Sequence, residues 1–212
     1  MLHSEFIPAA DKNSHRLMIM LHGLGDSIGG YRWLPEALNL PWLNFLLVNA
    51  PDEYCGGYSW FDYPDNLTPG VLRSRQLLFE LLDDLPAKGF PAEQITLAGF
   101  SQGSLMTVDV GLRYPRHFAG LIGISGWVFE IENMLKNISP IAKQQHLLIT
   151  HGPFDPLIPF DAVRKQVQTL KAAGLCVEWR EFPKAHEIYG EEELAVIREF
   201  VRAGYENGPG RR

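Results

Sequence analysis

Residues Gln94–Pro115 read QITLAGFSQGSLMTVDVGLRYP, and they carry the most informative pattern in the chain. The opening residues are apolar and closed by glycine, as in a buried strand, whereas apolar residues after Ser101 recur at helical spacing up to Tyr114. Ser101 therefore lies in a predicted strand-to-helix turn, between Gly99 and Gly103. In that context G-x-S-x-G predicts a nucleophile elbow, in which the helix N-terminus is aimed at a forming oxyanion. A serine that only caps a helix is the alternative.

Length and charge narrow the class of protein. We expect a single domain over residues 1–212, with a frayed tail at 207–212. The net charge of -6 argues against nucleic acid or an anionic membrane as a partner. Cys55 and Cys176 lie far apart without metal-ligand spacing, which favours reduced thiols and a cytoplasmic protein. We find no signal-peptide pattern at the start and no apolar run of membrane-spanning length.

Strand-like apolar runs alternate with helical patterns from Arg16 onwards, which is typical of an α/β fold with a mostly parallel sheet covered on both faces. The predicted strands are 17–21, 45–48, 95–100, 120–125, 147–151 and 175–182, and the predicted helices are 33–40, 71–86, 102–114, 131–137, 160–173 and 191–205. In such a sheet the ligand site lies at the carboxyl ends of the strands. Residues that directly follow a strand are therefore the candidates for function.

The segment HGLGD at 22–26 follows the first of these strands. Its glycines allow close backbone approach, so the N–H of Leu24 is a candidate second donor of an oxyanion hole, with the N–H of Gln102 as the first. The same glycines, together with Gly29, also resemble a degenerate dinucleotide-binding fingerprint. That fingerprint requires an acid at the end of the next strand, where this chain has Asn49.

A serine nucleophile needs a histidine base and a carboxylate that fixes the tautomer of the histidine. In this kind of fold the chain order is serine, acid, histidine, and His186 is the only histidine that follows the best candidate acid. Asp155 is that acid, because it follows a predicted strand in a loop stiffened by prolines. Asp109 belongs to the helix behind the nucleophile, and helix capping explains Asp161.

The substrate contacts are predicted from apolar loop residues. The segment 49–67, NAPDEYCGGYSWFDYPDNL, holds many aromatic residues for a loop, so they are either covered by the body or offered to a ligand. We predict Trp60 and Phe61 as walls of an apolar pocket, with a small core beneath the loop as the alternative. Leu157 and Ile158 are the other predicted substrate contacts.

Two further histidines, His22 and His151, each close a strand before a glycine. We predict that both are structural and hydrogen-bond the loops that carry the oxyanion donors and Asp155. The histidines are dispersed and the cysteines isolated, so the sequence predicts neither a metal site nor a cofactor.

Together these motifs resemble the phospholipase/carboxylesterase branch of the α/β-hydrolase superfamily, which includes acyl-protein thioesterases and small bacterial carboxylesterases. The matching segments are HGLGD (22–26), NAP (49–51), WFD (60–62), GFSQGS (99–104), HGPFDPLIP (151–159) and AHEI (185–188). The resemblance implies Ser101 as nucleophile with Asp155 and His186 as its partners, and the amides of Leu24 and Gln102 as the oxyanion hole. It also implies an α/β-hydrolase fold without a large cap.

The resemblance further implies a serine carboxylesterase that hydrolyses esters or thioesters of small to medium acyl chains through an acyl-enzyme. A lysophospholipase or acyl-protein thioesterase is the alternative, and a dinucleotide-binding or non-catalytic α/β domain is a remote one. Ser104 and Ala185 stand where the family usually has glycine, and the loop after Asn49 looks shorter, which leaves the acyl preference open. Exposed aromatic residues would suit a homodimer.

Overall fold

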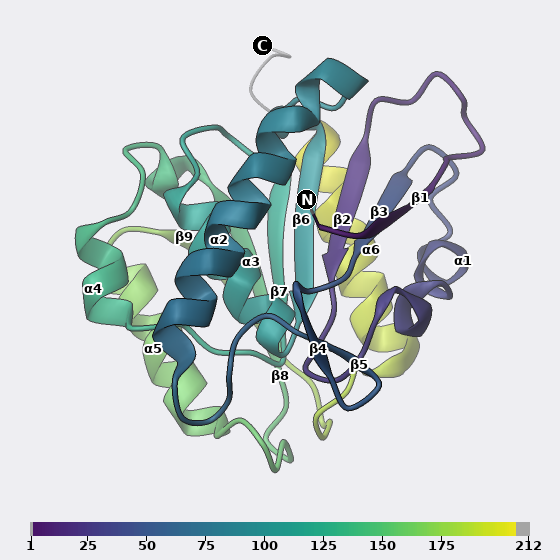
Figure 1. Cartoon of the computed structure of the whole chain (residues 1–212). Coiled ribbons are helices and arrows are strands. Elements are labelled where there is room, and N and C mark those ends of the chain that lie inside the picture. Colours follow the sequence, from purple (N-terminus) through teal and green to yellow (C-terminus); the bar gives the residue numbers. More distant parts are fainter. Residues whose placement is uncertain (1, 207–212) are drawn as a thin grey trace.

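The computed structural model describes residues 2–206 and shows a seven-stranded sheet between two layers of helices (Figure 1). The strand order is β1-β3-β2-β6-β7-β8-β9, in which β1 is antiparallel to β3 and the other neighbours are parallel. These strands span Ser4–Ile7 (β1), Leu17–Leu21 (β2), Asn44–Val48 (β3), Ile95–Phe100 (β6), Gly120–Ile124 (β7), His146–His151 (β8) and Cys176–Glu181 (β9). The tail predicted to fray, 207–212, lies outside the described residues.

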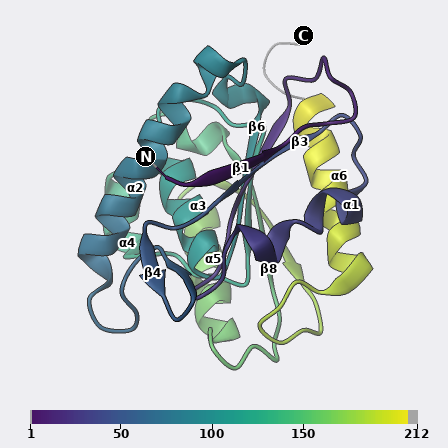
Figure 2. The ribbon, with the colours of Figure 1, turned by 45° about the vertical axis from the view of Figure 1, so that its right-hand side comes forward.

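The helices cover both faces of the sheet. They span Leu34–Leu38 (α1), Leu67–Asp84 (α2), Gln102–Arg113 (α3), Ile131–Lys136 (α4), Phe160–Ala172 (α5) and Gly190–Glu206 (α6), with short 3-10 turns at Ile28–Tyr31, Pro86–Lys88, Ala92–Gln94 and Ala142–Gln144. Helices α2, α3 and α5 lie on one side, and α1 and α6 lie on the other (Figure 2). The predicted α/β architecture is confirmed.

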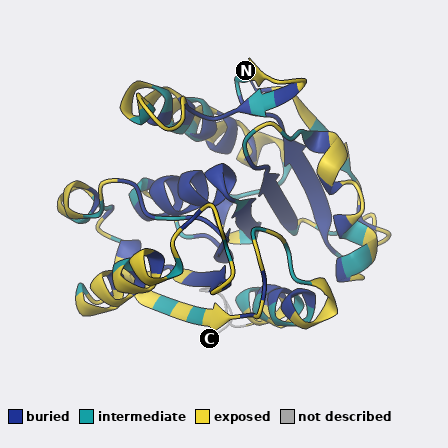
Figure 3. Cartoon of the chain, turned by 90° about the horizontal axis from the view of Figure 1, so that it is seen from below, coloured by how far each residue is buried: buried dark blue, intermediate teal, exposed yellow. Residues whose placement is uncertain are grey.

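The strand β2 shows how one apolar run serves both faces. Its alternate residues Leu17, Ile19 and Leu21 join the core under α2 and α3. Met18 and Met20 point the other way, into the core under α1 and α6. All five are buried, as expected for a central parallel strand that is covered on both faces. The middle strands are correspondingly buried, while the outward faces of the helices are exposed (Figure 3).

Two elements were not predicted from the sequence. The strand β1 adds an antiparallel edge beside β3. A small hairpin of β4 (Asp52–Tyr54) and β5 (Gly57–Ser59) occupies part of the aromatic loop. Its turn has positive φ at both central residues, Cys55 (48°) and Gly56 (85°), the backbone of a two-residue hairpin turn.

Two further properties concern the helices and the cysteines. Within residues 2–206, no helix combines the length and the apolar character that crossing a bilayer requires. Cys55 and Cys176 are both free and exposed.

Candidate active site

The turn between β6 and α3 holds Ser101 in a strained conformation. Its φ is 55° and its ψ is -115°, a region that costs a non-glycine residue about 1–3 kcal/mol. Close packing explains the flanking glycines: a Cβ on Gly99 would lie 2.2 Å from the carbonyl oxygen of Gly103, and one on Gly103 would lie 2.1 Å from that of Leu21. Glycine is thus required at both positions, because a side chain at either one would push α3 away from the sheet.

The three residues predicted as a triad meet at the carboxyl edge of the sheet. Ser101 follows β6, Asp155 follows β8, and His186 follows β9. The Nε2 of His186 lies 2.9 Å from the Oγ of Ser101, and its Nδ1 lies 2.8 Å from the Oδ2 of Asp155. A carboxylate can only accept, so Nδ1 carries the proton and the lone pair of Nε2 faces the serine hydroxyl. This is the arrangement in which a histidine can take the serine proton.

The side chain of Asp155 is buried, and both of its oxygens accept hydrogen bonds. Its Oδ1 accepts the backbone N–H groups of Leu157 and Ile158, both at 2.9 Å, while Oδ2 accepts from His186. Burial alone would raise the pKa of Asp155, but the hydrogen bonds from Ile158, His186 and Leu157 outweigh it and hold the pKa below its usual value. The side chain is therefore a carboxylate at neutral pH.

The segment 22–26 passes directly beside Ser101. A Cβ on Gly23 would lie 3.3 Å from the Cβ of Ser101, so only glycine allows this approach without displacement. Within the described residues, neither the N–H of Leu24 nor that of Gln102 has a protein acceptor. Gln102 is the first residue of α3, so its N–H is among the free donors of a helix N-terminus.

His22 holds the segment 22–26 in place through hydrogen bonds of its ring. The N–H of Ala50 donates to its Nε2 (3.0 Å), so Nδ1 must carry the proton and donate to the carbonyl of Gly23 (2.6 Å). The indole N–H of Trp60 donates to the carbonyl of His22 (2.9 Å). Burial lowers the pKa of His22, which outweighs the opposing hydrogen bond to Gly23. The predicted structural role of His22 is confirmed, because its neutral ring links the segment 22–26 to Ala50, which follows β3.

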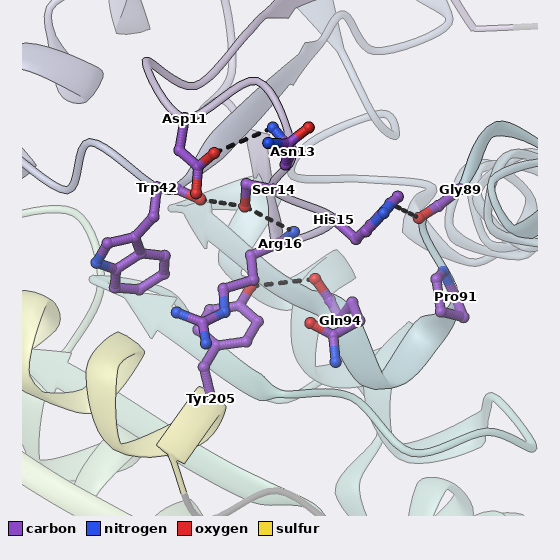
Figure 4. Close-up of a pocket in the computed structure, with 10 residues that line it drawn as sticks. All are labelled: Asp11, Asn13, Ser14, His15, Arg16, Trp42, Gly89, Pro91, Gln94 and Tyr205. Carbon is purple, nitrogen blue, oxygen red and sulfur yellow. Dashed lines mark hydrogen bonds between the residues drawn. The ribbon is translucent and has the colours of Figure 1, made fainter.

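A cavity of about 540 Å³ lies at the opposite end of the sheet, before β2, β3 and β6 begin (Figure 4). It is lined by Asp11, Asn13, Ser14, His15, Arg16, Trp42, Gly89, Pro91, Gln94 and Tyr205. The hydroxyl of Ser14 donates to the carbonyl of Trp42, and His15 bonds the carbonyl of Gly89 through Nδ1 (3.0 Å). The guanidinium of Arg16 stacks over Trp42, 4.7 Å from the ring centre. Because its serine and histidine are engaged separately, this cavity has no nucleophile-base pair.

The sequence left a dinucleotide site open, and the structure bears on it. Asn49, at the end of β3, accepts the N–H of Ile28 through Oδ1 (2.8 Å) and so ties two loops together. It is a structural amide at the position where the fingerprint needs a carboxylate. Among residues 2–206, no group of three or more His, Cys, Asp or Glu side chains could hold a metal ion.

Comparison with known proteins assigns the family. A family model described as phospholipase/carboxylesterase matches residues 2–204. This chain belongs to the phospholipase/carboxylesterase family. Acyl-protein thioesterase 1 of Schizosaccharomyces pombe is 32% identical over 155 residues, which cover 67% of this chain and 69% of that protein. A probable carboxylesterase of Oryza sativa subsp. japonica is 29% identical over 211 residues, covering 92% and 79%. The crystal structure of Arabidopsis thaliana SOBER1 has a TM-score of 0.81 and 26% identity, covering 90% and 99%.

The pocket residues of this phospholipase/carboxylesterase family member differ from the prediction. Trp60 and Phe61 were expected to line an apolar pocket, but both are completely buried in the core under α2. Gln102 holds them there, a role of its side chain that was not predicted. Its Oε1 accepts the N–H of Trp60 (3.0 Å), and its Nε2 donates to the carbonyl of Phe61 (2.9 Å). Both residues are therefore covered by the body of the protein, as part of its main core and not of a small separate core beneath the loop.

The other two predicted substrate contacts, Leu157 and Ile158, differ in exposure. Leu157 is 62% exposed beside Asp155, and Phe154 on the same loop is 67% exposed. Ile158 is buried, and its backbone serves Asp155. The aromatic loop does border a cavity of about 300 Å³, whose lining is more polar than expected: Tyr54, Ser59, Asp62, Tyr63, Asp65 and Asn66. The hydroxyl of Ser59 lies 3.3 Å from the Oε1 of Gln102, which places this cavity next to the residue that follows Ser101.

The buried histidines predict a pH-dependent stability. His151 is fully buried and bonds the carbonyl of Ile158 through Nε2 (3.1 Å), and burial lowers its pKa, as it does that of His22. Below a pH of about 6.5 the unfolded chain binds protons that the folded protein does not. We expect the free energy of unfolding to fall with decreasing pH from there, by up to about 1.4 kcal/mol per pH unit for each histidine.

Urea unfolding between pH 8 and pH 5 measures this slope. The variant His151→Gln should reduce the slope to the contribution of His22, whereas His146→Gln, at an exposed position, should leave it unchanged. A free energy of unfolding that stays constant over the range would contradict the prediction.

Proposed function

We propose that this chain is a serine carboxylesterase that hydrolyses esters or thioesters of small to medium acyl chains through an acyl-enzyme on Ser101. The observation that carries the proposal is the continuous line from Ser101 through His186 to Asp155, with contacts of 2.9 and 2.8 Å. The names of its relatives, acyl-protein thioesterase and carboxylesterase, support an enzyme that acts on ester bonds.

The proposed mechanism follows from the protonation states in the site. Nε2 of His186 takes the proton of Ser101 as Oγ attacks the substrate carbonyl. The N–H groups of Leu24 and Gln102 stabilise the oxyanion that forms. His186 then protonates the leaving alcohol or thiol, and the acyl group stays on Ser101. Water, activated by the same histidine, releases the acid and restores the serine. Because His186 must be neutral to act as a base, activity should rise with pH.

The acyl contact is proposed to be open and shallow. Leu157 and Phe154 offer exposed apolar surface beside Asp155. Trp60 and Phe61, which were predicted to wall an apolar pocket, are buried in the core. An open apolar strip suits a short or medium chain, since a long chain would leave much of its length in water. A lysophospholipase or acyl-protein thioesterase using the same residues is the alternative. The cytoplasmic location and the homodimer stay predictions.

Hydrolysis of p-nitrophenyl esters from acetate to palmitate tests the acyl preference. We expect kcat/KM to peak between butyrate and octanoate. The variant Leu157→Ser should lower kcat/KM for octanoate about tenfold, since about 1.4 kcal/mol of apolar contact is lost, and should leave acetate unchanged. A peak at palmitate would favour the lysophospholipid or acyl-protein alternative. Equal losses for acetate and octanoate would contradict the role of Leu157.

A further inference from the structure

A fully buried ion pair lies beside the histidine loop. Lys184 belongs to the loop that joins β9 to α6, two residues before His186, and Glu193 lies in the first turn of α6. The Nζ of Lys184 contacts both carboxylate oxygens of Glu193, at 2.6 and 2.9 Å, and neither side chain is exposed. Such pairs are rare inside proteins because both charges lose their hydration.

Glu193 contacts the loop on both sides of His186 in the sequence. Glu193 also accepts the backbone N–H of Tyr189 through Oε2 (2.5 Å), so one carboxylate holds a residue before the histidine and a residue after it. The other backbone N–H donors of this stretch make local turns, from Lys184 to Phe182, from Glu187 to Ala185 and from Gly190 to Ile188. The hydroxyl of Ser125 also donates to the carbonyl of Glu187, at a longer 3.4 Å. Glu193 therefore makes the shortest side-chain contacts that hold the two ends of the loop.

Lys184 also ties the histidine loop to the loop of Asp155. Its carbonyl accepts the N–H of Phe154 (3.2 Å). A Cβ on Gly152 would lie 2.1 Å from that carbonyl oxygen and 2.4 Å from the Lys184 side chain, so the two loops pack directly on each other. Burial lowers the pKa of the Lys184 ammonium, while the Glu193 carboxylate opposes this effect. The ion pair therefore fixes the spacing of the loops that carry the base and the acid.

We propose that Lys184 and Glu193 are positioning residues that hold His186 at hydrogen-bonding distance from both Ser101 and Asp155. The proposal rests on the hydrolytic function proposed above. A buried ion pair generally adds little stability over an apolar pair of similar volume, but breaking it on one side is costly. Stability and catalysis should therefore respond differently when both charges are replaced together.

The test compares the double variant Lys184→Met/Glu193→Leu with the wild type. We expect the midpoint of thermal unfolding to be kept or raised, and kcat on p-nitrophenyl butyrate to fall by about 10- to 100-fold with KM within about twofold, because the base is displaced while the acyl contact remains. Glu191→Gln is the matched control, since it breaks an exposed pair with Arg198 on the same helix and should leave kcat unchanged.

Wild-type kcat in the folded double variant would overturn the proposal. If the double variant does not fold, Glu193→Gln decides, because it keeps the shape but cannot serve Lys184 and Tyr189 as a carboxylate does. A folded Glu193→Gln protein with a kcat reduced several-fold supports the proposal, and one with full kcat overturns it. Failure of the proposed function is distinguishable, since the wild type itself would then neither hydrolyse esters nor be labelled at Ser101 by a fluorophosphonate.

Discussion

Replacement of Ser101 by alanine is expected to lower kcat for p-nitrophenyl butyrate by about 10⁶, the scale of loss when the nucleophile of another serine hydrolase is removed. Without Oγ no acyl-enzyme can form, and His186 faces a methyl group. The residual rate would come from water positioned near the N–H groups of Leu24 and Gln102. The fold should be retained, because alanine at a φ of 55° carries the same backbone strain as serine.

Ser14→Ala is the control for this experiment. Ser14 lies next to His15 in the 540 Å³ cavity at the amino end of the sheet, where a serine and a histidine also occur together. The Ser14→Ala protein should keep its full activity. Hydrolysis that survives Ser101→Ala, or that is lost in Ser14→Ala, would mean that the elbow is not the reactive site.

The variant Asp155→Asn is expected to lower kcat by about 10⁴, by analogy with the same change in a triad of another fold. The two backbone N–H groups of Leu157 and Ile158 would hold the amide oxygen, so the NH₂ group would point at Nδ1 of His186. Nδ1 would then have to accept, the proton would move to Nε2, and the ring would present an N–H to Ser101. A histidine in that tautomer cannot take the serine proton.

Asp161→Asn provides the matched change. Asp161 is an exposed residue in the first turn of α5 and was the neighbouring candidate acid in the sequence. We expect its kcat to equal that of the wild type. A loss of less than tenfold in Asp155→Asn, or a large loss in Asp161→Asn, would assign the acid's role to another carboxylate. Steady-state kinetics together with a far-UV circular dichroism spectrum of each variant is sufficient.

The sequence predicted those parts of the fold that follow strong local patterns. The central strands are short apolar runs, and each was placed to within one residue at either end. The hairpin was missed because its turn has Cys55 at a positive φ, where Asn or Asp would have been the usual signal. Helix α2 begins at Leu67, before the predicted Val71, because Pro69 lies in the first turn, where a missing N–H costs no helical bond. Strand β1 is half exposed and defined only by its pairing with β3.

For the candidate site, too, the sequence predicted some residues and could not predict others. Ser101, Asp155 and His186 could be chosen because each follows a strand and their chain order is constrained, and the structure brings their side chains together. Trp60 could not be placed, because its burial depends on the side chain of Gln102, which lies far away in sequence. The pattern shows that an aromatic residue needs cover, but only the tertiary structure shows what covers it.

The steric demand at the elbow has an evolutionary consequence. Gly99 and Gly103 are needed for α3 to pack on the sheet, whether or not Ser101 reacts with anything. Selection for folding alone would therefore preserve both glycines after catalysis had been lost, whereas His186 itself could change, since its side chain belongs to neither core cluster. In descendants of such a chain, an intact G-x-S-x-G would be poor evidence of a working enzyme, and the state of the histidine loop would be the better guide.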